Sequence, residues 1–497
     1  MLLAAGCGFT PETNPSISAT SPSNGATNIA TNTTITAIFN LAMNSTTINT
    51  STFTLMEGTT PGNPITGTVT YTTGTATFTP SAPLVHNTTY TATITTGVQN
   101  VNGDAMTGNY SWVFTTGSGA GAKFSIFTST GGAFSAGAAF DKTRNKYLAG
   151  IRGDAAGPNN IAARRMDGFG NISSSISLNS TGGTPAVAFD GTKSLVVWSD
   201  ANGIKGAKID SANAVTLLPD PISSAAGTTI GTQSVLCNSL ECAVAWKDNN
   251  GTGYTNSISS YSACQLAGAH TITGTSTSAG DISIASDGNT YFAAWDTGME
   301  IRGSIVTKCG MQDINNNFLI AAKSQSLNCT DHNPVSVAFD GTNYLVVWND
   351  HSDCATVPKS DILAQYIDSF GNRVNPTSDV SPFQINTTNT WRAARPSIAF
   401  DGTNYLVVWT DGRNDADKNG ICESTEGTCD DVYGQYLSKS GKVVGSEFVI
   451  NNDAGNQIGF VTGFNAGSYF LTINSGVTQD SQGISSGIAI FGLSITP

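Results

Sequence analysis

The sequence predicts an all-β protein in which a β-sandwich is followed by a seven-bladed β-propeller. Only 11% of the 497 residues are charged, whereas Gly, Ser, Thr and Asn are abundant. This composition is typical of short strands joined by tight turns. Segments near the start alternate apolar and polar residues, as half-buried strands do. Further along, one pattern recurs about every 50 to 60 residues, the period of a four-stranded propeller blade.

The first predicted domain spans residues 12–117. Its expected strands are the alternating segments at residues 34–39, 67–71, 75–78 and 90–94, which recur at the spacing of a β-sandwich. The domain also contains the short sequences SPSNGA, FN, FTP and NTTY, and it ends on YSWVFTTG. Over nearly its whole length it resembles the bacterial Ig-like domain of the S-layer-protein (SbsA-like) type.

This resemblance implies a spacer or adhesive module on a bacterial surface. Tyr90 and Trp112 are expected in the core of the sandwich, where large aromatic side chains are usually buried. A role in stacking against a ligand is the alternative for both. Residues 118–122, SGAGA, predict a short flexible linker before the propeller at residues 123–497.

The propeller repeat is clearest at residues 338–348, AFDGTNYLVVW. It returns with few changes at residues 188–198 and 399–409, and weaker copies begin at residues 139, 236, 285 and 463. Because Asp-Gly favours a tight hairpin turn, each copy predicts the two inner strands of a blade. A third strand is expected after each copy, at residues 161–164, 204–207, near 258, 301–304, 362–365, 432–435 and 488–491.

The ends of the propeller domain are expected to close the ring together. The seventh copy reaches residue 497 before a fourth strand can form, and residues 123–128, KFSIFT, belong to no copy. We expect this early segment to supply the missing strand, because closure removes the open sheet edge. A ring of six or eight blades is the alternative, since the first and last copies are weak.

The eight cysteines other than Cys7 predict disulfides in an oxidising compartment, because none forms a C-x-x-C pair or has zinc-like spacing. Cross-strand partners in a hairpin have position numbers with a constant sum. Phe339 and Tyr344 define one such pair, and two cysteine pairs fit this register in two copies of the repeat. A third pair closes a small loop and a fourth follows by elimination. The two pairs that fit the register are Cys329–Cys354 and Cys237–Cys242. The pair that closes a small loop is Cys422–Cys429, and the pair left by elimination is Cys264–Cys309.

Residues 415–426, DADKNGICESTE, match the calcium-loop pattern D-x-[DN]-x-[DN]-G-x5-E. No helical pattern flanks them, so they resemble an EF-hand loop placed between strands. The acidic side chains repel one another unless a cation compensates, which favours a structural calcium ion over a solvated acidic loop, the alternative. The predicted ligands are Asp415, Asp417, Asn419, the carbonyl of Ile421, Glu423 and Glu426.

Two sets of residues recur at fixed repeat positions. Five tryptophans share one position, which predicts packing between blades, with carbohydrate stacking as the alternative. Acidic residues two positions later are expected at strand ends on one face, where they line a polar mouth or bond to neighbouring loops. The tryptophans are Trp198, Trp246, Trp295, Trp348 and Trp409, and the acids are Asp200, Asp248, Asp350 and Asp411.

The sequence contains no catalytic signature that we recognise. G-x-S-x-G and H-E-x-x-H do not occur, and His86, His270, His332 and His351 have no nucleophile at motif spacing. Asp353 and Asp361 flank one loop without such a partner. We therefore expect that the protein is not an enzyme. The alternative is a secreted propeller glycoside hydrolase or lyase that acts on polysaccharide. Arginines that could bind an anionic sugar are Arg152, Arg302, Arg392 and Arg395.

Residues 2–7, LLAAGC, resemble the end of a bacterial lipoprotein signal. This resemblance implies that Cys7 is lipidated and that residues 1–11 are a signal remnant and tether. No later segment approaches the roughly 18 apolar residues of a membrane helix, so membrane attachment is expected only through the lipid. The formal net charge of −13 repels phosphate backbones and excludes nucleic acid as an expected partner.

These observations predict an exported lipoprotein on the bacterial cell surface, either anchored in the outer membrane or extracellular. It is expected to act as a binding, adhesion or scaffold module whose propeller face recognises a glycan or a surface protein. A purely structural envelope protein is a further alternative.

Overall fold

The computed structural model divides the chain into two compact units, Met1–Gly119 and Ala120–Pro497. Among the residues that it describes, no helix is long and apolar enough to cross a membrane. The structure describes residues 14–29, 31, 33–58, 62–82, 84–85, 88–117, 123–133, 137–154, 157–167, 171–200, 203–218, 222, 229–237, 241–249, 254–262, 270–272, 282–308, 313–323, 334–353, 359–374, 381–386, 392–414, 430–453, 456–465, 468–479 and 485–495.

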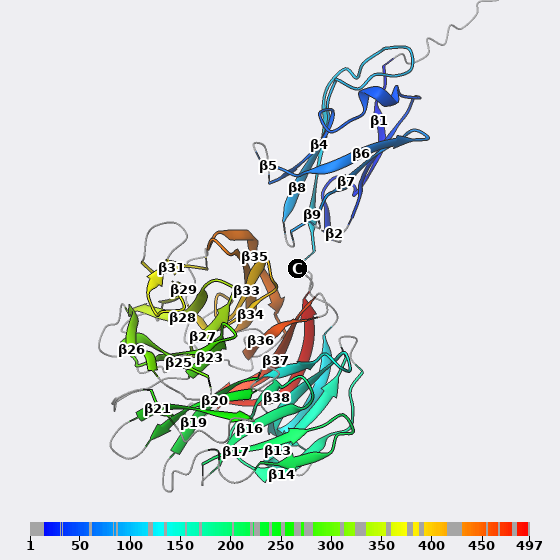
Figure 1. The fold of residues 1–497 in the computed structure, drawn as a ribbon. Helices are drawn as coiled ribbons and strands as arrows, with labels where there is room; N and C mark the ends of the chain where they lie inside the picture. The colour runs from blue at the N-terminus through cyan, green and yellow to red at the C-terminus, as the bar shows by residue number, and fades with distance from the viewer. Residues whose placement is uncertain are drawn as a thin grey trace, which may run out of the picture. The chain divides into compact units, whose positions relative to one another are not determined.

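The first unit is a β-sandwich of two sheets, with the strand orders β1-β3-β7-β6 and β2-β9-β8-β4-β5 (Figure 1). Every strand predicted from the alternating segments is present. Tyr90 and Trp112 are buried in the core with Phe53 and Phe78, so their predicted core position is confirmed. The elements are β1 Ile17–Ser21, β2 Ala26–Ile29, β3 Ile35–Phe39, the 3-10 helix η1 Ser45–Thr47, β4 Phe53–Glu57, β5 Asn63–Pro64, β6 Gly67–Thr72, β7 Thr75–Pro80, β8 Thr89–Ile94 and β9 Tyr110–Thr116.

The described strands of the second unit form seven sheets, numbered here in the chain order of their inner strands. Sheet 1 is β11 Ala138–Asp141, β12 Lys146–Asp154, β13 Gly157–Met166 and β14 Ile176–Thr181; sheet 2 is β15 Ala186–Phe189, β16 Ser194–Asp200, β17 Gly203–Ile209 and β18 Val215–Leu217; sheet 3 is β19 Thr229–Cys237, β20 Glu241–Asn249, β21 Tyr254–Ser262 and β22 His270–Thr271. Sheet 4 is β23 Ile282–Ser286, β24 Thr290–Asp296, β25 Glu300–Thr307 and β26 Asp313–Ala322; sheet 5 is β27 Ser336–Phe339, β28 Tyr344–Asp353, β29 Lys359–Ile367, β30 Arg373–Val374 and β31 Phe383–Gln384; sheet 6 is β32 Ala393–Phe400, β33 Asn404–Asp411, β34 Asp431–Ser438 and β35 Val443–Asn451.

Sheet 7 joins the two ends of the second unit. Its order is β36-β37-β38-β10, built from β36 Asn456–Asn465, β37 Ser468–Gln479, β38 Ser485–Ile495 and β10 Phe124–Ala133. The early segment thus pairs with the last strand, as predicted, with Phe124 opposite Gly492. Each inner strand contacts the inner strand of the next sheet, and β36 contacts β11, so the inner strands form a closed β-propeller (Figure 1).

The inner hairpins have the register that the repeat predicts. Phe339 lies opposite Tyr344, and the same pairing joins Phe400 with Tyr405 and Cys237 with Cys242. All seven predicted third strands fall within β13, β17, β21, β25, β29, β34 and β38.

The five repeated tryptophans pack between sheets, as predicted, and each is at most 1% exposed. Trp348, for example, lies in one apolar cluster with Phe292 and Ala294 of sheet 4. The other four tryptophans share clusters with the preceding sheet in the same way. Burial at these positions leaves no aromatic face for a sugar, so the carbohydrate-stacking alternative is wrong.

Serine hydroxyls tie four pairs of neighbouring inner strands. In each, the serine Oγ accepts a hydrogen bond from a backbone N–H of the next inner strand, and we call this contact the serine clasp. Because the inner strand is the edge of its sheet, this N–H has no strand partner of its own. The clasps join Ser234 to Ile284 (3.3 Å), Ser283 to Val337 (3.3 Å), Ser336 to Ile398 (3.2 Å) and Ser397 to Val461 (3.1 Å).

Ser397→Ala tests the energetic role of the clasp. Ser397 is buried, and its Oγ also donates to the carbonyl of Val461 at 3.1 Å. The substitution leaves two buried backbone groups without this partner, so we expect the free energy of unfolding to fall by about 1–3 kcal/mol. Denaturant unfolding measures the change, with Ser211→Ala on an exposed turn as the control. Equal stability of the two variants would show that the clasp contributes nothing.

Candidate functional site

Tight turns close the inner hairpins at one end of the propeller. In four of them an aspartate begins the turn, and its Oδ1 accepts hydrogen bonds of 2.6 to 2.8 Å from the N–H groups two and three residues later. The glycine that follows has a positive φ, which explains the repeated Asp-Gly pair. These carboxylates therefore hold turns together. They belong to Asp190, Asp287, Asp340 and Asp401.

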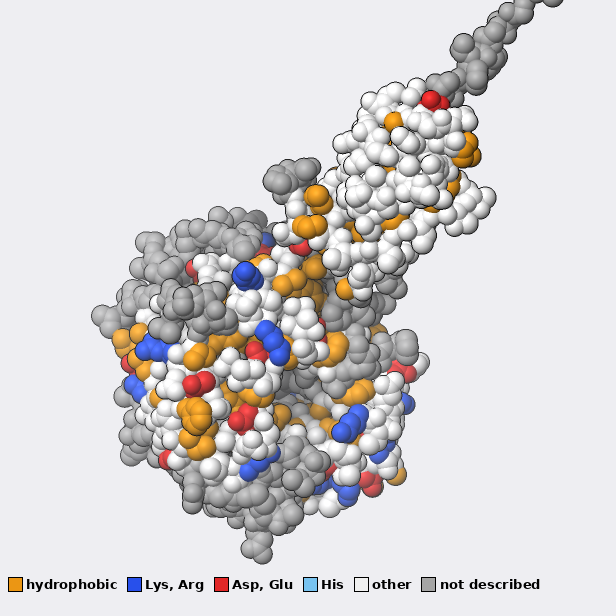
Figure 2. Space-filling model, turned by 45° about the horizontal axis from the view of Figure 1, so that its top comes forward, with side chains coloured by type: hydrophobic (Ala, Val, Ile, Leu, Met, Phe, Trp, Pro, Cys, Tyr) orange, Lys and Arg blue, Asp and Glu red, His pale blue; other side chains and the backbone are white. Residues whose placement is uncertain are grey.

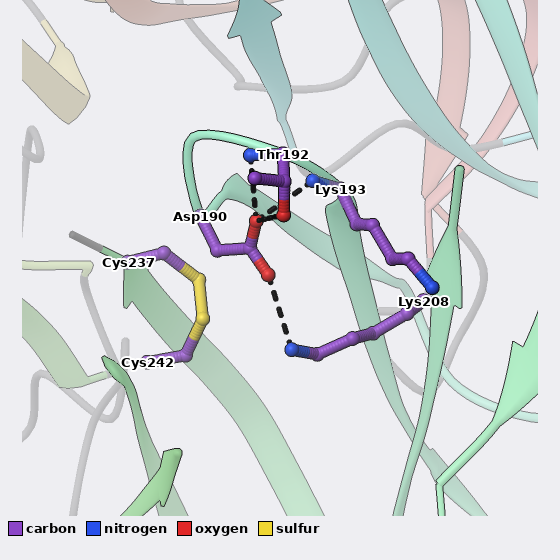
Figure 3. The surroundings of a disulfide bond; sticks show 6 residues. All are labelled: Asp190, Thr192, Lys193, Lys208, Cys237 and Cys242. Atoms are coloured by element: carbon purple, nitrogen blue, oxygen red, sulfur yellow. Dashed lines mark hydrogen bonds and ion pairs between the residues drawn. A yellow bond between two sulfur atoms is a disulfide. The ribbon is translucent and has the colours of Figure 1, made fainter. Parts of the chain in front are cut away.

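Asp190 has an additional partner, the ammonium group of Lys208, at 3.0 Å (Figure 3). Burial opposes ionisation of this carboxyl group. The hydrogen bonds from Lys193, Thr192 and Lys208 outweigh that effect and hold the pKa of Asp190 below its ordinary value. The carboxylate is therefore committed to its own turn rather than offered to a ligand.

A disulfide replaces an aromatic pair in sheet 3. Cys237 and Cys242 are bonded, as predicted, and occupy the hairpin position that Phe339 and Tyr344 hold in sheet 5. The rings of that pair lie 4.8 Å apart. Figure 3 shows the disulfide across from the Asp190 turn. Cys237 also lines a cavity at the turn end of the propeller.

A cavity of about 330 Å³ opens at this end of the propeller. It lies against the inner strands β11, β15 and β19 and their turns. Most of its lining side chains are apolar, and Lys142 is the ionisable one among them. The lining residues are Ala138, Ala139, Phe140, Lys142, Val187, Ala188, Phe189, Gly191, Val235, Leu236 and Cys237.

The space-filling view shows one face of the second unit, where apolar side chains gather around a hollow (Figure 2). Basic and acidic side chains are interspersed around them among the residues drawn in colour. Such a face lacks the broad field of one sign that steers polyanions to a surface.

A charged cluster lies at the end of sheet 6 that is remote from its Asp401 turn, on β33, β34, β35 and the residues that follow β33. The guanidinium of Arg413 donates to both carboxylate oxygens of Asp411, at 2.9 and 2.7 Å, and to Glu447 at 2.9 Å. It also stacks over the ring of Tyr433 at 3.8 Å. Asp411 accepts a further hydrogen bond from Trp409 Nε1 at 2.8 Å. These groups are therefore bound to one another.

The pKa values of Arg413 and Asp431 are both raised, for different reasons. Burial lowers the pKa of Arg413, but its hydrogen bonds with Asp411 and Glu447 and their charges outweigh burial and raise it overall. Asp431, which lies opposite Asp411 across the strands, has a raised pKa, because burial and the charges of Asp411 and Asp430 outweigh the hydrogen bond from Asn414. Within the described part of the chain, Asp431 Oδ1 is buried without a hydrogen-bond partner.

The residues of the predicted calcium loop, 415–426, lie outside the described residues. So do Cys7 and the cysteines of the other three predicted bridges, together with His86 and His332. Side chains of His270, His351, Asp248 and Asp353 are likewise outside the description. In the described part, no group of three or more His, Cys, Asp or Glu side chains could hold a metal ion by itself.

The remaining polar residues singled out in the sequence are spread over the propeller. Asp361 lies opposite Asp350 and accepts hydrogen bonds from Gln384 (2.9 Å) and Asn386 (3.2 Å). Arg302 is paired with Glu300 at 2.7 Å, and Arg392 with Asp430 at 3.4 Å. The structure does not bring the four arginines into one site, since they belong to sheets 1, 4 and 6.

Sequence reasoning missed the cavity and the charged cluster around Arg413. The sequence does contain a sign of the cavity. At the repeat position where four copies have the clasp serine, the copy in sheet 1 has Gly137 and the copy in sheet 2 has Ala186. The Arg413 cluster had no such signal, since Glu447 is 34 positions away from Arg413 and reaches it only because β33 pairs with β34 and β34 pairs with β35.

Residues 11–116 match the family model of a bacterial Ig-like domain, which identifies the fold family of the first unit. No curated protein matches the chain. Similar solved structures include an auxiliary nutrient binding protein from Bacteroides thetaiotaomicron VPI-5482, with 10% identity and a TM-score of 0.39, covering 98% of each chain. The Cps50 (Swd1) β-propeller domain of Myceliophteria thermophila has 11% identity and a TM-score of 0.41, covering 70% of this chain and 96% of that one. The endosialidase of phage phi92 has 10% identity and a TM-score of 0.41, covering 78% and 71%. At these values the likenesses carry no argument about activity.

Asp190→Asn tests the role of the turn carboxylates. At pH 7 we expect the variant to be about 1 kcal/mol less stable, because a neutral amide is a weaker acceptor than a carboxylate. The folded-state pKa of Asp190 is lowered, so its contribution is present above the unfolded value of about 3.9 and is lost as the pH falls through the folded value.

Thermal unfolding of wild type and variant between pH 7 and pH 2 measures this difference. The two melting temperatures should converge at the acidic end of that range. Lys208→Gln separates the ion pair from the turn hydrogen bonds. A difference that persists unchanged at pH 2 would contradict the assignment of the effect to ionisation.

Proposed function

We propose that this chain is a binding protein of the bacterial cell surface. In this proposal the Ig-like unit is a spacer of the S-layer (SbsA-like) type, Cys7 carries a lipid anchor, and the second unit is a closed seven-bladed propeller that holds a glycan or a protein ligand. The seven sheets and the ring of contacting inner strands support the blade number. The sequence LLAAGC supports the anchor.

The cavity at the turn end of the propeller is the single observation that carries the binding function. Ligand sites are concave and combine apolar side chains with a few polar groups, and this cavity is lined by apolar side chains together with Lys142. The carboxylates nearest to it, such as that of Asp190, are bound to their own turns. A site of this composition favours holding a ligand over breaking one of its bonds.

Blocking the cavity tests this function. We expect the full chain to bind one or more members of a panel of bacterial surface polysaccharides and glycoproteins, and Ala139→Trp to weaken that binding at least tenfold by filling the space. Ala212→Trp on an exposed turn is the matched control, and melting temperatures confirm that both variants fold. Equal binding by both variants would place the ligand elsewhere. Absence of binding to every panel member would favour a purely structural envelope protein.

A structural calcium ion between β33 and β34 is part of the proposal. The motif at residues 415–426 supplies the predicted ligands, and Asp411, Asp430 and Asp431 bring further negative charge to the strand ends that flank it. The buried Asp431 oxygen without a partner among the described residues fits a site that a cation compensates.

Calcium should therefore raise the melting temperature of the full chain relative to the chain in EDTA, because a ligand that binds only the folded state stabilises it. Glu426→Ala should abolish this shift by removing the predicted bidentate ligand. Glu300→Ala, which removes an acidic residue outside the motif, is the control. No shift at millimolar calcium would leave the loop a solvated acidic insertion.

A polysaccharide hydrolase or lyase is the competing function, and the cluster around Arg413 favours it, because it contains carboxylates, a tyrosine and an arginine. Tyr433 is only 8% exposed, and Arg413 is bonded to Asp411 and Glu447. We infer a structural role for this cluster. Release of reducing ends from a surface polysaccharide by wild type, and its loss in Tyr433→Phe, would favour the enzyme instead.

A further inference from the structure

The serine clasp is missing at three successive junctions of the inner ring. Four inner strands carry a serine at the clasp position. The other three carry residues that have no hydroxyl group, so the next inner strand receives no clasp from them. These residues are Phe460 in β36, Gly137 before β11 and Ala186 in β15.

The N–H groups that lack a clasp point away from their own hairpins. In sheet 2 the Asp190 N–H donates to the Lys193 carbonyl, and bonded and non-bonded pairs alternate from there along the hairpin. Val187, opposite Val196, falls on a non-bonded pair, as does Val337 opposite Val346.

The N–H of Val337 reaches Ser283 on the preceding inner strand, so the equivalent N–H of Val187 faces the corresponding gap between β11 and β15. Val235 and Ala138 hold this position in β19 and β11, opposite Val244 and Ala149. Three neighbouring inner strands thus each present one N–H donor that no serine caps.

All three of these donor residues line the cavity. Ala138, Val187 and Val235 lie against it together with Lys142, which brings a positive charge. No acidic side chain is among its lining residues in the described structure. Backbone N–H donors beside a single cation are the arrangement that binds an anionic oxygen group.

The rest of the lining specifies what is attached to that group. Phe140, Phe189 and Leu236 offer apolar surface, and side-chain hydroxyl or amide groups that would bind the many hydroxyls of a sugar are missing from the described lining. The volume of about 330 Å³ lies at the lower end of the range for small-molecule sites. The occupant is therefore small and carries one apolar group.

We propose that this cavity binds a carboxylate with an adjoining apolar group. One carboxylate oxygen accepts a hydrogen bond from the uncapped N–H group of Val187, in the gap beside Gly137. The carboxylate faces Lys142, while the apolar group contacts Phe140 and Phe189. This chemistry belongs both to a peptide C-terminus that ends in an apolar residue and to a free aryl or alkyl acid. The inference rests on the proposed function in placing the ligand in this cavity, and of the two ligand classes proposed there it favours the protein over the glycan.

The test compares N-acetylphenylalanine with N-acetylphenylalanine amide, which differ only in the carboxylate. Calorimetry or NMR titration of the full chain should give an affinity for the acid at least tenfold above that for the amide. Lys142→Gln should reduce binding of the acid and leave that of the amide unchanged.

Restoring the missing clasps tests the position of the site. Gly137→Ser and Ala186→Ser add the hydroxyl groups that the other junctions have, and a Cβ at Gly137 meets nothing within 4 Å. The hydroxyl of Gly137→Ser should occupy the N–H group of Val187 and weaken binding of the acid at least tenfold. Ala186→Ser caps Val235 in the next gap and should leave binding of the acid unchanged, and neither variant should lower the melting temperature. Ser336→Ala, which removes a clasp outside the cavity, should leave binding unchanged.

The outcomes separate this inference from the proposed function. Equal affinity for acid and amide would overturn carboxylate recognition, and so would the absence of binding by both. Acid binding that survives Gly137→Ser would overturn the assigned donor. The panel experiment with Ala139→Trp stands apart from these results, because it does not depend on the charge of the ligand. The tripeptide Ala-Ala-Phe and 3-phenylpropionate then distinguish the two sources, according to which binds more tightly.

Discussion

The pairing of β10 with β38 is the constraint on which the second unit depends. A ring of sheets that is joined only by sequence has one free end, and its last sheet would expose an unpaired strand edge. Phe124 opposite Gly492 and Ser125 opposite Phe491 join the beginning and the end of the unit in one sheet. Every contact between neighbouring sheets, including that of β36 with β11, then acts within a closed circle, so no sheet can separate from one neighbour without straining the others.

Two kinds of interaction join neighbouring sheets within this circle, and they differ in how much stability is lost when the side chain is replaced. The tryptophans supply large buried surfaces and recur in five copies of the repeat, since loss of such a side chain from a core is costly. The serine clasp satisfies a single N–H at the edge of an inner strand, which water or a ligand can also do. A junction can therefore lose its serine and keep its tryptophan. This is the case between sheets 1 and 2, where Gly137 stands at the clasp position, and between sheets 2 and 3, where Ala186 does. The cavity lies at those junctions.

Local patterns made most of the fold predictable from the sequence. The register of the inner hairpins follows from Asp-Gly turns and alternation, and for this reason the Cys237–Cys242 bridge and the Phe339–Tyr344 pair could be placed by arithmetic on residue numbers. Closure by residues 123–128 followed from counting strands. The loss of serine at Gly137 and Ala186 can be seen in the sequence, but its link to a cavity requires knowing which N–H group each repeat position reaches on the neighbouring inner strand. The calcium loop at residues 415–426 stays a prediction of the sequence.

The two ends of the propeller differ in how their charges are used. At the turn end, carboxylates such as that of Asp190 are neutralised by N–H groups of their own turn, so the cavity beside them contains a cation and no acidic side chain. At the other end of sheet 6, Asp411 and Asp431 lie opposite each other, and one arginine pairs with the first while the second keeps a buried oxygen without a partner in the described chain. Such an excess of carboxylates attracts a cation and repels an anion. An anionic ligand is thus favoured at the turn end of sheets 1 to 3 and a structural cation at the other end of sheet 6, where neither competes for the groups that the other requires.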